Sequence, residues 1–181
     1  TMVRLLAERK VDGFILPRTK MQDARIVLCR EERAPFILYG RTGDDTDCAW
    51  YDIRGEEAMG EAVLRLAGFG HRRIGWLGGL ADYAYTRLRR EGFLAGMAEA
   101  GLVPDPSLMQ DGVFTIEDGY NAGLRLLHHE APPTAVVCAL DLAAFGLYRA
   151  AERMGQRVGR DLAVISYDNS PEAATADPPL S

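Results

Sequence analysis

Two aspartates that follow short apolar runs are the residues of this sequence whose types and spacing could do chemistry. Asp141 comes after the run at 134–140, and Asp168 comes after the run at 162–167, with a helical pattern between them. Two buried strands joined by one helix make a right-handed parallel βαβ unit, whose strands end at the same edge of a sheet. Ligands of open α/β sheets bind at that edge. The spacing therefore predicts two carboxylates at a ligand-binding edge.

The chemistry open to such a pair is recognition of hydroxyl groups. Carboxylates can accept paired hydrogen bonds from the vicinal hydroxyls of a sugar, and an arginine such as Arg89 can donate from the opposite side. Each residue also has a structural alternative. Asp141 precedes a helical pattern and suits helix capping equally well, whereas Asp168 precedes no clear helix. Arg89 could instead form a salt bridge on a solvated helix face, which would contribute little.

The elements that must position these residues alternate between strand and helix along the whole chain. Apolar runs predict strands, and residues with helical spacing, bounded by caps and glycines, predict helices. The expected strands are at 14–16, 36–39, 49–53, 73–77, 112–114, 134–140 and 162–167. The expected helices are at 1–10, 23–33, 56–67, 87–100, 115–127 and 142–154. This alternation predicts an α/β fold with parallel sheets flanked by helices.

Composition limits the function classes. The 181 residues suffice for one α/β domain or two small lobes, and a net charge of −5 argues against this segment being a nucleic-acid surface by itself. Three cysteines without metal-ligand spacing fit reduced thiols in the cytoplasm. No stretch has membrane-spanning length. The sequence lacks a phosphate-binding loop, a nucleophile elbow and a His-Glu-x-x-His motif, so neither an enzyme nor a bound cofactor or metal is expected.

Several segments together resemble the LacI-type transcriptional regulators. They occur in the family's order and at its intervals along nearly the whole chain: VDGFIL at 11–16, APFILYGR at 34–41, GHRRIGWLGG at 70–79, RREGF at 89–93, PTAVVCALD with AFG at 133–146, RVGRDLAVISYDN at 157–169 and PPLS at 178–181. The resemblance implies a periplasmic-binding-protein-like effector domain with two α/β lobes around a sugar-sized cleft. It implies that residues 1–72 belong to the first lobe, 73–176 to the second, and 177–181 to the start of the return crossover. The family's helix-turn-helix domain, the start of its first lobe and its carboxyl-terminal return segment have no counterpart in this sequence.

The resemblance also carries over effector contacts. It implies that Arg89 and Asp168 bind the effector, with Asp141, Asp52 and Tyr85 as further expected contacts. The sequence departs from the family pattern at two of these places. Leu140 replaces an asparagine beside Asp141, which suggests a less polar ligand edge, and Arg54 replaces an acid near Asp52, which would admit a charged or acidic sugar.

The leading hypothesis is an effector-sensing domain of a cytoplasmic, homodimeric regulator, and not an enzyme. A sugar or sugar-like effector would bind between the lobes and alter affinity for operator DNA, which is read by a helix-turn-helix domain outside this chain. One alternative is an extracytoplasmic sugar-binding receptor of a transporter, which shares the fold. A nucleotide-dependent α/β enzyme is the second alternative, and the lack of a phosphate-binding loop argues against it.

Overall fold

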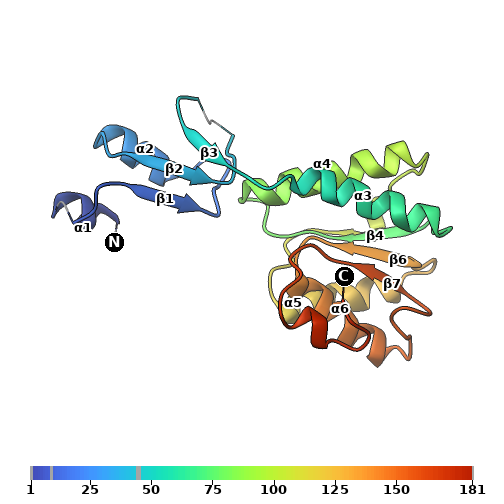
Figure 1. The fold of residues 1–181 in the computed structure, drawn as a ribbon. Coiled ribbons are helices and arrows are strands. Elements are labelled where there is room, and N and C mark those ends of the chain that lie inside the picture. The colour runs from blue at the N-terminus through green and yellow to red at the C-terminus, as the bar shows by residue number, and fades with distance from the viewer. Residues whose placement is uncertain (1, 9, 44–45, 181) are drawn as a thin grey trace. The chain divides into compact units, whose positions relative to one another are not determined.

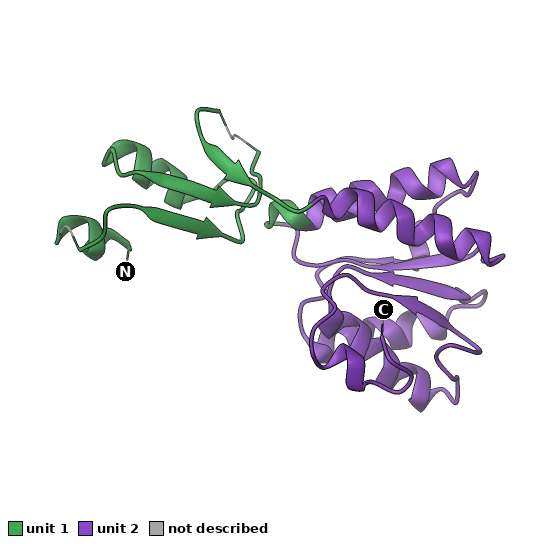
Figure 2. Ribbon diagram, in the orientation of Figure 1, with its two compact units in different colours: residues 1–53, 82–85 green, residues 54–81, 86–181 purple. Residues whose placement is uncertain are grey.

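The computed structural model describes residues 2–8, 10–43 and 46–180, which form two compact units (Figure 2). Unit 1 comprises Thr1–Ile53 together with Asp82–Tyr85, and unit 2 comprises Arg54–Ala81 together with Thr86–Ser181. Each unit has a parallel sheet of its own, as the alternating sequence pattern predicts.

Unit 1 is a three-stranded parallel sheet in the order β1-β2-β3. The strands are β1 (Phe14–Pro17), β2 (Phe36–Tyr39) and β3 (Ala49–Tyr51), and the helices are α1 (Met2–Ala7) and α2 (Ala24–Glu31). Leu16 and Leu38 pack against Ile26 and Cys29 of α2 to form the core of this unit. Asp23 caps α2 by accepting a hydrogen bond from the N–H of Arg25.

Unit 2 contains a four-stranded parallel sheet in the order β5-β4-β6-β7. Figure 1 shows α3 and α4 on one face of this sheet and α5 and α6 on the other. The strands are β4 (Ile74–Leu77), β5 (Met109–Gln110), β6 (Ala135–Cys138) and β7 (Ala163–Ile165). The helices are α3 (Gly55–Gly68), α4 (Ala84–Glu99, whose first two residues belong to unit 1), α5 (Ile116–Leu127) and α6 (Asp141–Arg153), with short 3-10 helices η1 (Pro106–Leu108) and η2 (Ala173–Thr175).

The two faces of the unit 2 sheet bury alternate residues, which is the two-residue period of a strand. On β6, Ala135 and Val137 join the core beneath α3 and α4, whereas Val136 and Cys138 join the core beneath α5 and α6. Trp76 on β4 is completely buried and packs against Phe93 of α4, with ring centroids 5.0 Å apart. Because both faces are covered, these strands read as continuous apolar runs in the sequence.

Two expectations about unit 2 are corrected by the structure. The strand expected at 112–114 is wrong, because the strand that pairs with β4 is β5, in the register Trp76↔Met109 and Leu77↔Gln110. Gly112 then turns the chain with a φ of 80°. The helix expected at 87–100 begins three residues earlier, at Ala84, so Tyr85 lies on this helix.

The two compact units divide between residues 53 and 54, whereas the resemblance implies lobes that divide after residue 72, and that lobe boundary stays a prediction. The helix α3 lies between these two positions. Its apolar residues Met59, Val63 and Leu66 belong to the same core as Ile74 and Trp76 of β4. The apolar face of α3 therefore places the helix in unit 2.

Candidate functional site

The carboxyl edge of the unit 2 sheet brings Arg89 and Asp168 together. Nη1 of Arg89 donates a hydrogen bond to the carbonyl oxygen of Ala139 at 2.5 Å and lies 3.7 Å from Oδ1 of Asp168. The Arg89 guanidinium carbon also lies 3.5 Å from the ring centroid of Tyr167, a cation–π contact. The Arg89 side chain is only 11% exposed, whereas that of Asp168 is 39% exposed. The Arg89 guanidinium is thus held in place by Ala139 and Tyr167, and the Asp168 carboxylate beside it is open to a ligand.

The two strand-end aspartates stabilise the start of α6 through hydrogen bonds that the sequence did not indicate. The N-cap of α6 is Leu140, which forms no capping side-chain bond, and Asp141 is the first helical residue. Oδ2 of Asp168 accepts the hydrogen bond from the N–H of Asp141 at 3.1 Å. Asp141 does not cap its own helix: its Oδ2 accepts from the N–H of Ser170 at 2.7 Å. Asp168 therefore satisfies the helix terminus from the neighbouring strand, and Asp141 ties the helix to the loop after β7.

The carboxylate of Asp141 is buried, and hydrogen bonds keep it ionised. Burial by itself raises the pKa of Asp141, but the bond from the N–H of Ser170 and the adjacent hydroxyls of Ser166 and Ser170 together outweigh that cost, so the pKa lies below its ordinary value. Neither hydroxyl meets ordinary hydrogen-bond geometry, and Oδ1 of Asp141 has no partner that does. The backbone bond from Ser170 is accordingly the main interaction that keeps this carboxylate ionised.

Replacing Asp141 with asparagine is expected to lower the free energy of unfolding at pH 7 by about 1 kcal/mol. The folded-state pKa is below the unfolded-state value, so the carboxylate stabilises the fold above pH 4 or so, and this contribution disappears as the pH falls through the folded-state pKa. Urea unfolding of both proteins at pH 7 and pH 3 should show a difference that shrinks in acid. An equal difference at both pH values would contradict this role.

The other two expected contacts lie in unit 1. Asp52 follows β3, and its Oδ2 forms an ion pair with Nε of Arg41 at 2.8 Å, with both side chains largely buried. Tyr85 stacks on Tyr83, with ring centroids 5.4 Å apart. Arg54, which departs from the family pattern, forms an exposed ion pair with Glu57 at 3.2 Å within unit 2. Ligand binding by Asp52 and Tyr85 stays a prediction.

A hollow of about 420 Å³ in unit 2 adjoins both strand-end aspartates. Its size suits a small ligand. Its walls combine carboxylates and hydroxyls with apolar side chains: Ile116, Asp141, Leu142, Phe145, Asp168, Ser170, Glu172, Thr175 and Ala176. A slightly larger groove of about 490 Å³ lies along β7 beside α3, but neither aspartate lines it. The smaller hollow is the better candidate because both aspartates line it, although Arg89 does not.

Sequence reasoning missed Tyr167, the carbonyl of Ala139 and the N–H of Ser170. Tyr167 directly precedes Asp168, so its proximity to the site could have been noticed. Its stacking on Arg89 could not, because these residues are on separate elements. Backbone groups such as those of Ala139 and Ser170 leave no signal in residue type at all.

No helix in the described part of the chain is long and apolar enough to cross a membrane.

Comparisons with known proteins agree with this architecture. Residues 63–181 match the model of the periplasmic binding protein-like domain. The HTH-type transcriptional regulator AglR of Rhizobium meliloti (strain 1021) is 32% identical over 170 residues, which cover 93% of this chain and 48% of AglR. The HTH-type transcriptional repressor CytR of Escherichia coli (strain K12) is 29% identical over the whole chain and 53% of CytR. The chain thus spans about half the length of these relatives.

Solved structures give the same result. A regulatory protein of the LacI family from Chloroflexus aggregans superposes with a TM-score of 0.91 at 35% identity, over 98% of this chain and 64% of that one. The transcriptional regulator CelR in complex with cellobiose superposes with a TM-score of 0.92 at 30% identity, over 99% of this chain and 56% of that one. The motifs, the fold and these relatives agree that the chain belongs to the LacI-type transcriptional regulators and carries their periplasmic-binding-protein-like effector-binding domain.

Proposed function

We propose that this domain senses a sugar or sugar-like effector and passes the signal to operator DNA. The observation that carries the proposal is the adjacency of Arg89 and Asp168 at the carboxyl edge of the unit 2 sheet, 3.7 Å apart. A fixed donor beside an open acceptor matches the vicinal hydroxyls of a sugar ring, each of which donates and accepts. The cellobiose bound by CelR, a structural relative, supports the same ligand class.

The rigidity of Arg89 supports a binding role over a merely structural one. Its guanidinium is held by the carbonyl of Ala139 and by the ring of Tyr167, so little side-chain entropy remains to be lost when a ligand binds. Leu140, by contrast, gives this edge an apolar neighbour, which suits the carbon face of a sugar. These features suit the orientation of a ligand, so the proposed role is binding and not catalysis.

Coupling to DNA would follow from a two-state movement of the domain. We infer that unit 1 belongs to the first lobe of the family and unit 2 to the second. An effector that contacts the carboxyl edges of both sheets stabilises one arrangement of the lobes by its differential affinity. In a homodimer, that arrangement would set the spacing of two helix-turn-helix domains on the operator. The curated relatives are transcriptional regulators, so the transporter-receptor alternative is not favoured. The cytoplasmic location stays a prediction.

Asp168→Asn is the variant that tests the site with least disturbance. Asparagine keeps an oxygen that can cap α6 but loses the charge, so sugar affinity is expected to fall about tenfold with little change in thermal stability. Isothermal titration calorimetry of the full-length protein with a panel of neutral and acidic mono- and disaccharides measures this. Asp161→Asn, at the opposite end of β7 in an exposed pair with Arg157, is the matched control. If no sugar binds, or if the two variants behave alike, the proposal fails.

A further inference from the structure

Arg18, at the carboxyl end of β1, has a strained backbone. Its φ is 51°, in the left-handed region that disfavours side chains with a Cβ. Arg18 directly follows Pro17, the last residue of β1, and so lies at the ligand-binding edge of the unit 1 sheet. A strained residue persists only where its surroundings impose the conformation.

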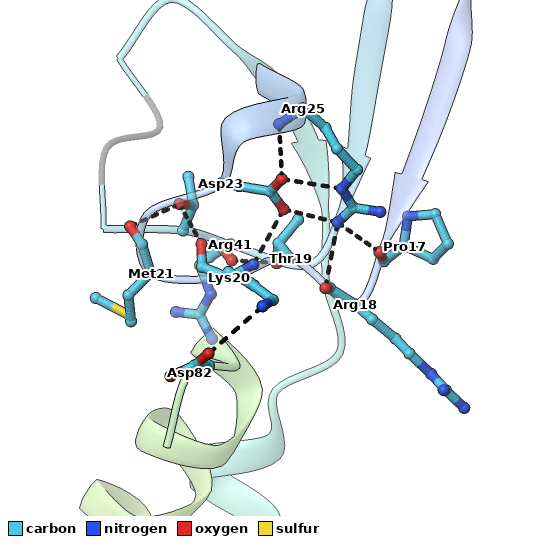
Figure 3. A network of polar contacts seen from close by, with 10 residues as sticks. Pro17, Arg18, Thr19, Lys20, Met21, Asp23, Arg25, Arg41 and Asp82 are labelled. Carbon is cyan, nitrogen blue, oxygen red and sulfur yellow. Dashed lines mark hydrogen bonds and ion pairs between the residues drawn. The ribbon is translucent and has the colours of Figure 1, made fainter. Parts of the chain in front are cut away.

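An ion pair between the buried Asp23 and the partly exposed Arg25 imposes it here (Figure 3). Nη2 of Arg25 donates to the carbonyl oxygens of Pro17 at 3.0 Å and of Arg18 at 3.2 Å. Asp23, only 7% exposed, holds that guanidinium through Nε at 2.9 Å and Nη2 at 2.6 Å. The same carboxylate accepts from the N–H of Lys20 at 3.1 Å. The loop after β1 is therefore fixed by a network that does not involve the Arg18 side chain.

The side chain of Arg18 points away from this network (Figure 3). It is exposed, and within the described residues it forms neither a hydrogen bond nor an ion pair. The other charged side chains at this edge neutralise each other, since Arg41 after β2 pairs with Asp52 after β3 at 2.8 Å. The edge of the unit 1 sheet thus presents one guanidinium on a fixed backbone, and no described ion pair compensates its charge.

We infer that Arg18 determines ligand specificity by binding an anionic group of the effector, a carboxylate or a phosphate. This inference rests on the proposed function, since it names the class of effector that the same domain senses. A guanidinium pairs with either oxyanion through two parallel hydrogen bonds, which makes it selective for that geometry. The ligand class that follows is an acidic sugar, such as a uronate or a sugar phosphate.

Arg18→Gly separates strain from binding, because glycine adopts a positive φ without steric cost. The variant is expected to raise the thermal midpoint by about 2 °C, and to bind an anionic sugar roughly ten- to a hundredfold more weakly. Arg33→Gly is the matched control. Arg33 has a φ of 52° but follows the end of α2, away from the carboxyl edge of the sheet. The Arg33→Gly variant should gain similar thermal stability and keep its full affinity for the anionic sugar.

Calorimetry of the full-length protein would use matched probes: glucose with glucuronate and glucose 6-phosphate, and galactose with galacturonate and galactose 6-phosphate. We expect a uronate or a sugar phosphate to bind more strongly than its neutral parent sugar, and we expect only Arg18→Gly to abolish this difference. Comparing the uronate with the sugar phosphate identifies which oxyanion is bound. Neutral sugars bound as tightly as the anionic ones, with no effect of Arg18→Gly, would overturn the inference and leave the proposed function standing. If neither neutral nor anionic probes bind, both are overturned.

Discussion

Arg89→Ala is expected to weaken effector binding about a hundredfold, the largest loss for any single side chain at the site. A hydrogen bond from a charged group contributes about 1.5–3 kcal/mol, and the upper value corresponds to roughly that factor. The loss should be large because Arg89 is held by Ala139 and Tyr167 before the ligand arrives. Removing it also leaves Asp168 without its cationic neighbour. Titration calorimetry with the best-binding sugar measures the effect.

Two further variants separate binding from structural damage. Arg89→Lys keeps the charge but loses the planar fork, so it is expected to recover only part of the affinity. Arg87→Ala removes an exposed arginine on the same helix that pairs with Glu91, and should leave affinity unchanged. Equal losses from Arg87→Ala and Arg89→Ala would mean that α4 acts through its overall charge and not through a defined contact.

Gly146→Ala is expected to destabilise unit 2 by about 2–3 kcal/mol and to lower the thermal midpoint by roughly 5–10 °C. The helices α5 and α6 approach closely at this glycine. A Cβ atom there would lie 2.2 Å from the carbonyl oxygen of Ile116 and 2.4 Å from the backbone nitrogen of Tyr120. Both obstructing atoms are backbone, so α5 would have to move as a whole. The overpacking cost should exceed the gain of about 1 kcal/mol in helix propensity.

Gly68→Ala provides the opposite control for that prediction. Gly68 is the last residue of α3, and no heavy atom lies within 4 Å of a Cβ placed there. Alanine should therefore stabilise the protein by up to about 1 kcal/mol. Differential scanning calorimetry of the two variants side by side is expected to show midpoint shifts of opposite sign. Shifts of the same sign and size would refute the close approach of α5 and α6.

Much of the fold follows from local sequence signals. The helices expected at 56–67 and 115–127 are found as α3 and α5, because the apolar spacing of α3 and the capping box of Thr115 with Asp118 each depend on residues a few positions apart. The parallel sheets follow from the alternation of strands and helices. The resemblance to the family adds the expectation that Arg89 and Asp168 contact the same effector, and the structure places these side chains 3.7 Å apart. The short strand β5 was misplaced because a two-residue strand has no periodicity, and only pairing with β4 selects it.

The roles of the site residues were decided by the tertiary structure. Residue type and spacing allowed Asp141 to cap its own helix, yet Asp168, 27 residues away, bonds to the first N–H of that helix. The direction of a carboxylate at a strand end depends on the register of neighbouring strands and on the path of the next loop, which involve distant segments. The strained backbone of Arg18 depends likewise on the ion pair of Asp23 and Arg25. The sequence by itself determined the family, the fold and the candidate residues, whereas long-range packing determined what each of them contacts.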